Sequence, residues 1–189
     1  MPPSKGSSKS ENSPAAEPGT DLLVVNDWRI GFHPALLLQL EKLISAVEKE
    51  TRRHPDRPPA SQPARILANL RQLMFVDVPQ DPGREMYRHG GTLSKRRKHW
   101  FRARFGNGRY RLFFRYRLAD RVLIFAWVND ERSPRTYGSS TDAYRVFAQK
   151  LDNDNPPDDW DALVKECSSR ETIQKLKRIL ARMNGNPER

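Results

Sequence analysis

Two neighbouring segments, residues 100–105 and 109–117, alternate between two kinds of side chain with a period of two. Phe, Ala, Leu and Tyr fill one set of positions, while Arg fills most of the other. Because successive side chains of a strand point to opposite faces of a sheet, this alternation predicts two strands with one aromatic and one arginine-rich face. The Gly-Asn-Gly sequence between them, residues 106–108, favours a tight antiparallel hairpin.

The flanking segments carry the patterns of further strands and of helices. Residues 122–128 are apolar throughout, which indicates a buried strand, and residues 24–32 alternate in the manner of a short first strand. Elsewhere apolar residues recur at helical spacing. These helices are expected at residues 34–54, 66–74 and 141–151, with Thr141 as the cap of the third, from residue 159 onward, and along residues 173–183.

Together these elements predict one α+β domain with an extension at each end. Two N-terminal helices are expected to pack on the aromatic face of a small, mainly antiparallel twisted sheet, and C-terminal helices follow it. The arginine face is expected to stay open. Residues 1–20, rich in Ser, Pro, Gly, Lys and Glu, predict a disordered tail. The domain itself is expected over residues 21–168, and a C-terminal helical extension over residues 169–189.

Composition argues against several classes of protein. The chain has no apolar run long enough to span a membrane and no secretory signal, which predicts a cytoplasmic protein without a membrane partner. Cys167 is the only cysteine, and the four histidines are scattered along the chain. We therefore expect no intramolecular disulfide, no metal site and no cofactor.

The net charge of +11 comes from one segment of the chain. Residues 84–117 hold twelve basic residues and one acidic residue, Glu85, whereas the rest of the chain holds 22 of each sign. A local positive field around aromatic residues is typical of proteins that bind a polyphosphate. The alternative is a solvated charged face, or long arginine stems that only cover apolar surface.

The expected arginine face needs an anion, because like charges that face each other weaken a sheet. Single-stranded RNA fits this requirement. Guanidinium groups bind phosphate oxygens with two parallel hydrogen bonds, and an exposed Trp100 would offer a surface on which a base stacks.

Motifs on and around the hairpin resemble a known family. A basic-x-basic strand, a Tyr-Arg strand, a hydrophobic strand and then Tyr137 follow one another as in RelE-type ribonuclease toxins. The YhaV branch of these toxins is the more similar one. The motifs that carry this second resemblance are Arg88-His89-Gly90, Phe105-Gly106, Gly108-Arg-Tyr-Arg-Leu-Phe-Phe-Arg-Tyr116, Asn129-Asp130-Glu131, Arg135-Thr-Tyr-Gly138, Thr141-Asp-Ala-Tyr144 and Pro156-Pro-x-x-Trp160.

The resemblance implies a RelE-like fold and the toxin of a type II toxin-antitoxin system. Such a toxin is expected to be a metal-independent endoribonuclease, an mRNA interferase. It would cleave mRNA by attack of the 2′-hydroxyl on the adjacent phosphate and so inhibit translation and growth. The implied partners are single-stranded mRNA, free or on the ribosome, and a PrlF-type antitoxin. Two alternatives are a non-catalytic RNA-binding or ribosome-associated protein, and a basic face that chiefly binds an acidic antitoxin segment.

Positions within these motifs suggest the roles of individual residues. Arg102, Arg104 and Arg111 are expected to hold and stabilise the phosphate. Arginine keeps its proton, so the general base must be a different residue. Carboxylate and imidazole groups exchange protons near neutral pH. The candidates for the general base are therefore, in order of preference, His89, Glu131 and His99.

Several of these candidates have a structural alternative. His89 precedes two glycines and suits a turn equally well, and Glu131 stands where RelE-type toxins have an arginine. Tyr137 is expected to stack on a base or to donate a proton, and its alternative is a packed tyrosine with a bonded hydroxyl. Further RNA contacts are expected from Trp100, Arg109, Arg115 and Arg135.

Overall fold

The computed structural model describes residues 22–133, 139 and 142–185. The tail predicted at residues 1–20 lies outside this part of the chain. The strands are β1 (Leu23–Val25), β2 (Trp28–Phe32), β3 (Phe101–Phe105), β4 (Tyr110–Arg117) and β5 (Val122–Val128). The α-helices are α1 (Pro34–Arg53), α2 (Gln62–Gln72), α3 (Val78–Gln80), α4 (Ala143–Asp152), α5 (Trp160–Cys167) and α6 (Arg170–Met183).

The strands form one sheet in the order β1-β2-β5-β4-β3, in which only β2 and β5 are parallel neighbours. The α+β class and the mainly antiparallel sheet are thus confirmed. The expected arrangement, in which two N-terminal helices lead into the sheet, is not matched, because β1 and β2 precede α1 and belong to the same sheet as the later strands. The single strand expected at residues 24–32 is a hairpin, because Asn26 and Asp27 adopt positive φ angles of 47° and 63° and reverse the chain.

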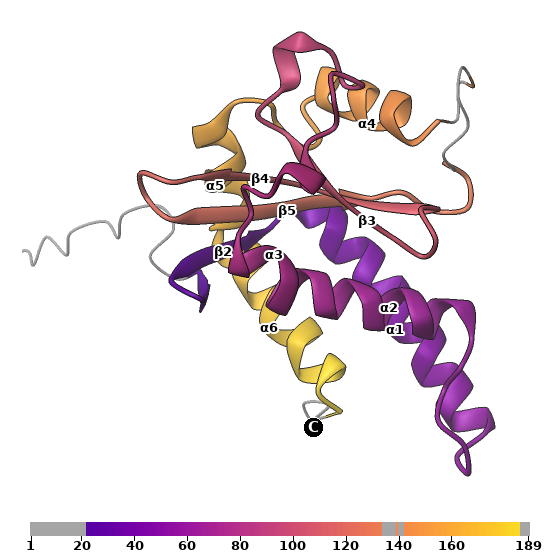
Figure 1. Ribbon diagram of the computed structural model, residues 1–189. Coiled ribbons are helices and arrows are strands. Elements are labelled where there is room, and N and C mark those ends of the chain that lie inside the picture. Colours follow the sequence, from indigo (N-terminus) through magenta and orange to yellow (C-terminus); the bar gives the residue numbers. More distant parts are fainter. Residues whose placement is uncertain (1–21, 134–138, 140–141, 186–189) are drawn as a thin grey trace, which may run out of the picture.

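Helices cover both faces of the sheet (Figure 1). Helices α1, α2 and α6 lie on one side, and α4 and α5 lie on the other. The first side buries the aromatic face of the hairpin, including Phe101 and Phe114, against Leu37 and Leu40 of α1. Burial of this apolar surface is the main term that stabilises the fold.

The expectation that the arginine face stays open was wrong. Trp100 and Phe113 on that face are fully buried and pack against Phe147 of α4, with ring centroids 5.1 and 4.1 Å apart, respectively. The apolar sides of α4 and α5 also need a partner, and the apolar residues between the arginines provide it. Trp100 therefore has no exposed ring for a base to stack on.

The hairpin between β3 and β4 is confirmed. Gly106, Asn107 and Gly108 all have positive φ angles, of 59°, 55° and 77°, as a tight reversal requires. The register places Arg104 directly opposite Arg111. The tip of this hairpin lies at the same end of the sheet as the carboxyl end of β5.

The helices near the C-terminus are part of the folded body. Asp142, rather than the expected Thr141, caps α4 by accepting a hydrogen bond from the Tyr144 backbone N–H, and Thr141 lies outside the described residues. Helix α6 places Leu176 and Ile179 in the core beside α1. In the part of the chain that the structure describes, we find no helix with the length and apolarity needed to cross a membrane.

Candidate active site

The arginines of the hairpin fall into two groups rather than one continuous face. Buried Phe113 separates them in the middle of β4. At the far end of that strand, the Arg115 side chain donates to the Asp158 carbonyl (2.7 Å) and lies over the Trp160 ring. Arg117 pairs with Asp120. The guanidinium group of Arg115 thus holds the start of α5, and that of Arg117 holds the turn after β4.

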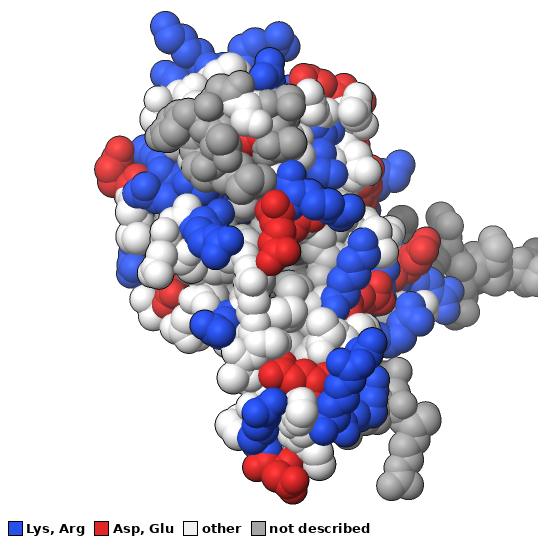
Figure 2. Space-filling view, turned by 90° about the vertical axis from the view of Figure 1, so that its right-hand side faces the viewer, with Lys and Arg blue, Asp and Glu red and all other residues white. Residues whose placement is uncertain are grey.

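The second group of arginines gathers towards the hairpin tip and includes the three residues expected to hold a phosphate. Arg104 and Arg109 are exposed, and neither side chain has a hydrogen-bond partner among the described residues. Arg102 and Arg111 are buried, with 8% and 6% of their surface exposed. Figure 2 shows this side of the molecule, where basic side chains lie on both sides of an uncharged area and acidic side chains border it above and below. The structure therefore brings two free and two buried guanidinium groups to one place.

Tyr144 connects the two buried arginines. Its hydroxyl accepts a hydrogen bond from Arg102 Nε at 2.8 Å, and its ring lies 5.5 Å from the guanidinium carbon of Arg111. Arg102 also donates through Nη1 to the Met86 carbonyl. Tyr144 sits in the first turn of α4, so the helix that covers the face also fixes its arginines. Sequence reasoning did not single out this residue, although it ends one of the quoted motifs.

Arg111 carries a buried donor that lacks a partner among the described residues. Its Nη1 donates to the Gly108 carbonyl at 3.0 Å, whereas its Nε is buried and has no hydrogen-bond partner in the described part of the chain. A buried donor on a charged group without a partner is costly, and such groups often mark a binding site. An anionic oxygen is the natural partner for this N–H group.

Asn129 holds the end of β5 against the hairpin. Its Oδ1 accepts from the Arg111 backbone N–H at 2.6 Å, and its Nδ2 donates to the carbonyls of Arg109 and Ser133 at 3.0 Å each. Asp130 follows and accepts hydrogen bonds from Ser133 Oγ and the backbone N–H of Arg132. Burial raises the pKa of Asp130, but these hydrogen bonds outweigh it, so its pKa is lowered.

The three candidate bases differ in their surroundings. Both ring nitrogens of His89 are engaged, because Nε2 lies 3.0 Å from the Arg97 carbonyl and Nδ1 accepts from the Leu93 backbone N–H at 3.4 Å. Burial lowers the pKa of His89, despite the opposing effect of the bond to Arg97. This neutral, bonded imidazole closes a turn, which is the structural alternative for this residue.

His99 is bonded to a carboxylate at the other end of β3. Its Nε2 lies 2.8 Å from Asp158 Oδ1, which also accepts from Trp100 Nε1 at 2.7 Å. Burial raises the pKa of Asp158, but the hydrogen bonds from His99 and Trp100 prevail and lower it. His99 precedes β3, whereas Arg104 lies near its far end, and an extended strand rises about 3.3 Å per residue. The structure therefore does not bring His99 to the hairpin tip.

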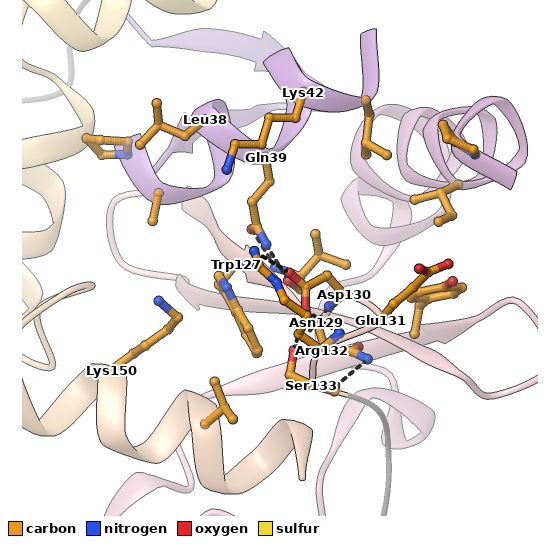
Figure 3. Close-up of a pocket in the computed structure, with 18 of the residues that line it drawn as sticks. Leu38, Gln39, Lys42, Trp127, Asn129, Asp130, Glu131, Arg132, Ser133 and Lys150 are labelled. Atoms are coloured by element: carbon orange, nitrogen blue, oxygen red, sulfur yellow. Dashed lines mark hydrogen bonds and ion pairs between the residues drawn. The ribbon is translucent and has the colours of Figure 1, made fainter. Parts of the chain in front are cut away.

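Glu131 is exposed and lies two residues beyond Asn129, at the hairpin end of the sheet. Its carboxylate has no partner among the described residues. It lines a groove of about 730 Å³ between α1, α2, the end of β5 and α4 (Figure 3). Of the three candidates, Glu131 alone combines a free proton-accepting group with this position.

Two of the predicted site residues, Arg135 and Tyr137, lie outside the described residues. Within the described part, no group of three or more His, Cys, Asp and Glu side chains is arranged to hold a metal ion. Guanidinium groups around a buried N–H without a partner are the chemistry that binds phosphate oxygens, and the free carboxylate of Glu131, on the segment after β5, is a group that can accept a proton.

Comparison with known proteins identifies the family. Residues 30–168 match the model of the YhaV toxin family, described as a toxin with endonuclease activity, of a toxin-antitoxin system. The chain is 38% identical over 143 residues to the ribonuclease toxin YhaV of Escherichia coli K12, covering 75% of this chain and 93% of that protein. The toxin YhaV of Escherichia coli O157:H7 matches equally. No solved structure matches.

The chain therefore belongs to the YhaV family of endonuclease toxins. The family to which the sequence motifs pointed is confirmed, as is the nuclease class of the activity. The match ends at residue 168, so α6 lies outside it although it packs into the core of this chain.

Proposed function

We propose that this toxin is a metal-independent endoribonuclease whose site lies at the tip of the β3–β4 hairpin. The observation that carries the proposal is the unsatisfied, buried Nε of Arg111, directly across the hairpin from exposed Arg104. The free carboxylate of Glu131 lies two residues beyond Asn129, whose side chain is bonded to the Arg111 backbone. The name of the relative from Escherichia coli K12, a ribonuclease toxin, supports RNA as the substrate.

The proposed reaction is an internal displacement on the RNA. Arg111 and Arg104 bind the non-bridging phosphate oxygens and stabilise the negative charge that develops on them. Glu131 accepts the proton of the 2′-hydroxyl as its oxygen forms a bond to phosphorus. The bond from phosphorus to the 5′-oxygen breaks, and Tyr137 is proposed to donate a proton to that oxygen. The products are a 2′,3′-cyclic phosphate and a 5′-hydroxyl end.

The buried Arg102 has a supporting role in this scheme. Its Nε and Nη1 donate to Tyr144 and to the Met86 carbonyl, so we propose that it acts through Tyr144 on the position of Arg111. Arg109 at the exposed tip is proposed to contact the phosphate on one side of the scissile bond. Arg115 and Trp100 are less suited to bind RNA, because both are packed against other elements.

The biological setting is part of the proposal. The substrate is mRNA in the cytoplasm, and its cleavage inhibits translation and growth. The motif order supports a RelE-like fold and a PrlF-type antitoxin as the partner that the toxin-antitoxin system requires. Whether the mRNA is cut on the ribosome is decided by comparing naked RNA with translating ribosomes.

The test is cleavage of a defined single-stranded RNA in excess chelator. Wild-type protein is expected to cut it, and Glu131→Gln is expected to lower the cleavage rate by about 10²-fold or more, since a positioned base contributes roughly that factor. Glu85→Gln, a change of another exposed glutamate, is the matched control. Binding of RNA without any product, with and without ribosomes, would instead support the non-catalytic alternative and contradict the proposal.

A further inference from the structure

The groove that Glu131 lines is larger than a single catalytic carboxylate requires. It has a volume of about 730 Å³. Helix α1 and the start of α2 form one wall, the end of β5 forms the floor, and α4 forms the other wall (Figure 3). A space of this size accommodates several side chains of a bound partner.

Apolar side chains make up much of the lining of the groove. Leu38 of α1 is the most notable, because 51% of its surface is exposed. Leu43, Ile66 and Val146 lie in the same lining. A leucine that is exposed within a hollow, among other apolar side chains, is typical of a surface that another protein covers.

Two lysines face the groove from opposite walls. In Figure 3 the Lys42 side chain reaches in from α1 and the Lys150 side chain from α4, on the same side of the floor. Neither lysine forms an ion pair among the described residues, whereas Arg132 in the same lining pairs with Asp130. The groove therefore presents apolar contacts between two lysines that lack ion-pair partners in the described part of the chain, while the free carboxylate of Glu131 lies on its other side.

From these observations we propose that the groove binds an amphipathic, acidic segment of the antitoxin. The apolar residues of that segment would contact Leu38, and its carboxylates would pair with Lys42 and Lys150. Charge complementarity of this kind selects a partner and speeds its association, while a buried apolar anchor supplies most of the affinity. The toxin-antitoxin system of this family implies an antitoxin as partner.

The lining favours a protein segment over RNA. Single-stranded RNA is bound by exposed aromatic faces and a track of basic residues. Here Trp127, the aromatic residue on the floor, is buried, and Lys150 already lies 5.6 Å from its ring centroid. The aliphatic walls offer no stacking surface. The free arginines Arg104 and Arg109 are not part of the lining.

An antitoxin segment bound in the groove would also explain how the antitoxin inhibits RNA cleavage by the toxin. Glu131 lies on the side of the groove away from the two lysines (Figure 3). A segment seated between the walls would cover its carboxylate and keep the 2′-hydroxyl of an RNA away from it. This consequence rests on the proposed function, whereas the binding itself does not.

The test measures the affinity of the full-length toxin for the antitoxin encoded beside it, by titration calorimetry. Leu38→Glu is expected to weaken binding by about tenfold or more, as loss of an interface anchor does. The double variant Lys42→Glu/Lys150→Glu is expected to weaken binding similarly and to reduce its dependence on salt. RNA cleavage by the free variants is expected to equal that of the wild type.

Matched controls carry the same changes at exposed positions outside the groove. Leu118→Glu, on a leucine with 67% of its surface exposed, and Lys49→Glu on α1 are expected to leave the affinity unchanged. Unchanged affinity in both groove variants would overturn the proposal. The proposal would also be overturned if the groove variants raised the KM for RNA while antitoxin binding stayed normal. A change in the oligomeric state of the toxin in these variants, with normal antitoxin binding, would overturn it too. If neither the wild-type toxin nor any variant cuts RNA, the proposed function fails, but the measured affinities for the antitoxin still decide this inference.

Discussion

Arg111 shows how a single residue joins the fold to the proposed chemistry. Its backbone N–H is bonded to Asn129 and its Nη1 to Gly108, so both strand ends fix it in place. The buried N–H group at Nε of its guanidinium has no partner among the described residues. A donor fixed in advance in this way stabilises developing charge without having to reorganise.

Arg111→Lys keeps the positive charge but loses the planar fork, because a lysine ammonium group is a point charge. We expect kcat/KM for RNA cleavage to fall by about 10²-fold or more, as when one donor to the transition state is removed. Steady-state cleavage of a short RNA measures this, and urea unfolding shows that the variant is folded. Arg117→Lys, at the exposed end of the same strand, is the control. Equal kcat/KM values for both variants would refute the role of Arg111.

Tyr144→Phe removes the oxygen that accepts the Arg102 Nε–H and leaves a buried charged donor without that partner. The free energy of unfolding is expected to fall by about 1–3 kcal/mol. Cleavage is expected to fall as well, because the bond from Arg102 to the Tyr144 hydroxyl holds in place the ring over which Arg111 lies. If Tyr144 is a positioning residue, kcat should drop more than KM rises. A variant with wild-type stability and kcat would show that the Arg102–Tyr144 contact contributes little.

At the scale of elements, the hairpin was predictable because its signals are local. Alternation over residues 100–117 and the Gly-Asn-Gly tip determine the strands and their turn. The cover of α4 over the arginine face was not predictable in the same way, since it depends on contacts between distant segments. Trp100 and Phe113 could have indicated this cover, because they are two large aromatic residues on the face that carries the arginines.

Two glycines at the hairpin tip allow the cost of a positive φ angle to be measured separately from the cost of a steric contact. A Cβ atom on Gly106 would lie 2.8 Å from Tyr110 Cδ2, whereas one on Gly108 would meet open space. Both residues have positive φ, so Ala at either position costs about 1–2 kcal/mol in unfolding free energy. Gly106→Ala is expected to cost about 1 kcal/mol more than Gly108→Ala, because a packed ring must move. Urea unfolding of both variants checks this, and equal losses would contradict the contact.

At the scale of the whole molecule, the structure has three layers, and its excess charge lies in the segment from Arg84 to Arg117. The sequence predicted this charge, the mixed fold and the family. It did not predict the groove, because its walls come from α1, α2, β5 and α4, which are far apart in the chain. Tyr144 was missed for the same reason, since only the folded chain places it between two arginines.

Stability of the whole fold is expected to depend on pH through two buried histidines. Burial lowers the pKa of His33 and of His89, against the opposing bonds that each makes. The contribution of these histidines to the free energy of unfolding is therefore fully present above their unfolded pKa of about 6.5. It is lost as the pH falls through their lower pKa values in the folded state. The free energy of unfolding should be lower at pH 5 than at pH 7.5. His89→Asn should reduce this dependence, while exposed His54→Gln should not.

The 2′-hydroxyl is the centre of the proposed chemistry, and its role is measured most directly with two matched RNAs. One is all RNA, and the other carries a single 2′-deoxy nucleotide on the 5′ side of the mapped cleavage site. In excess chelator, the first is expected to yield a 2′,3′-cyclic phosphate and a 5′-hydroxyl end, while the second stays intact at that position. Equal cleavage of both RNAs at that site would contradict the account.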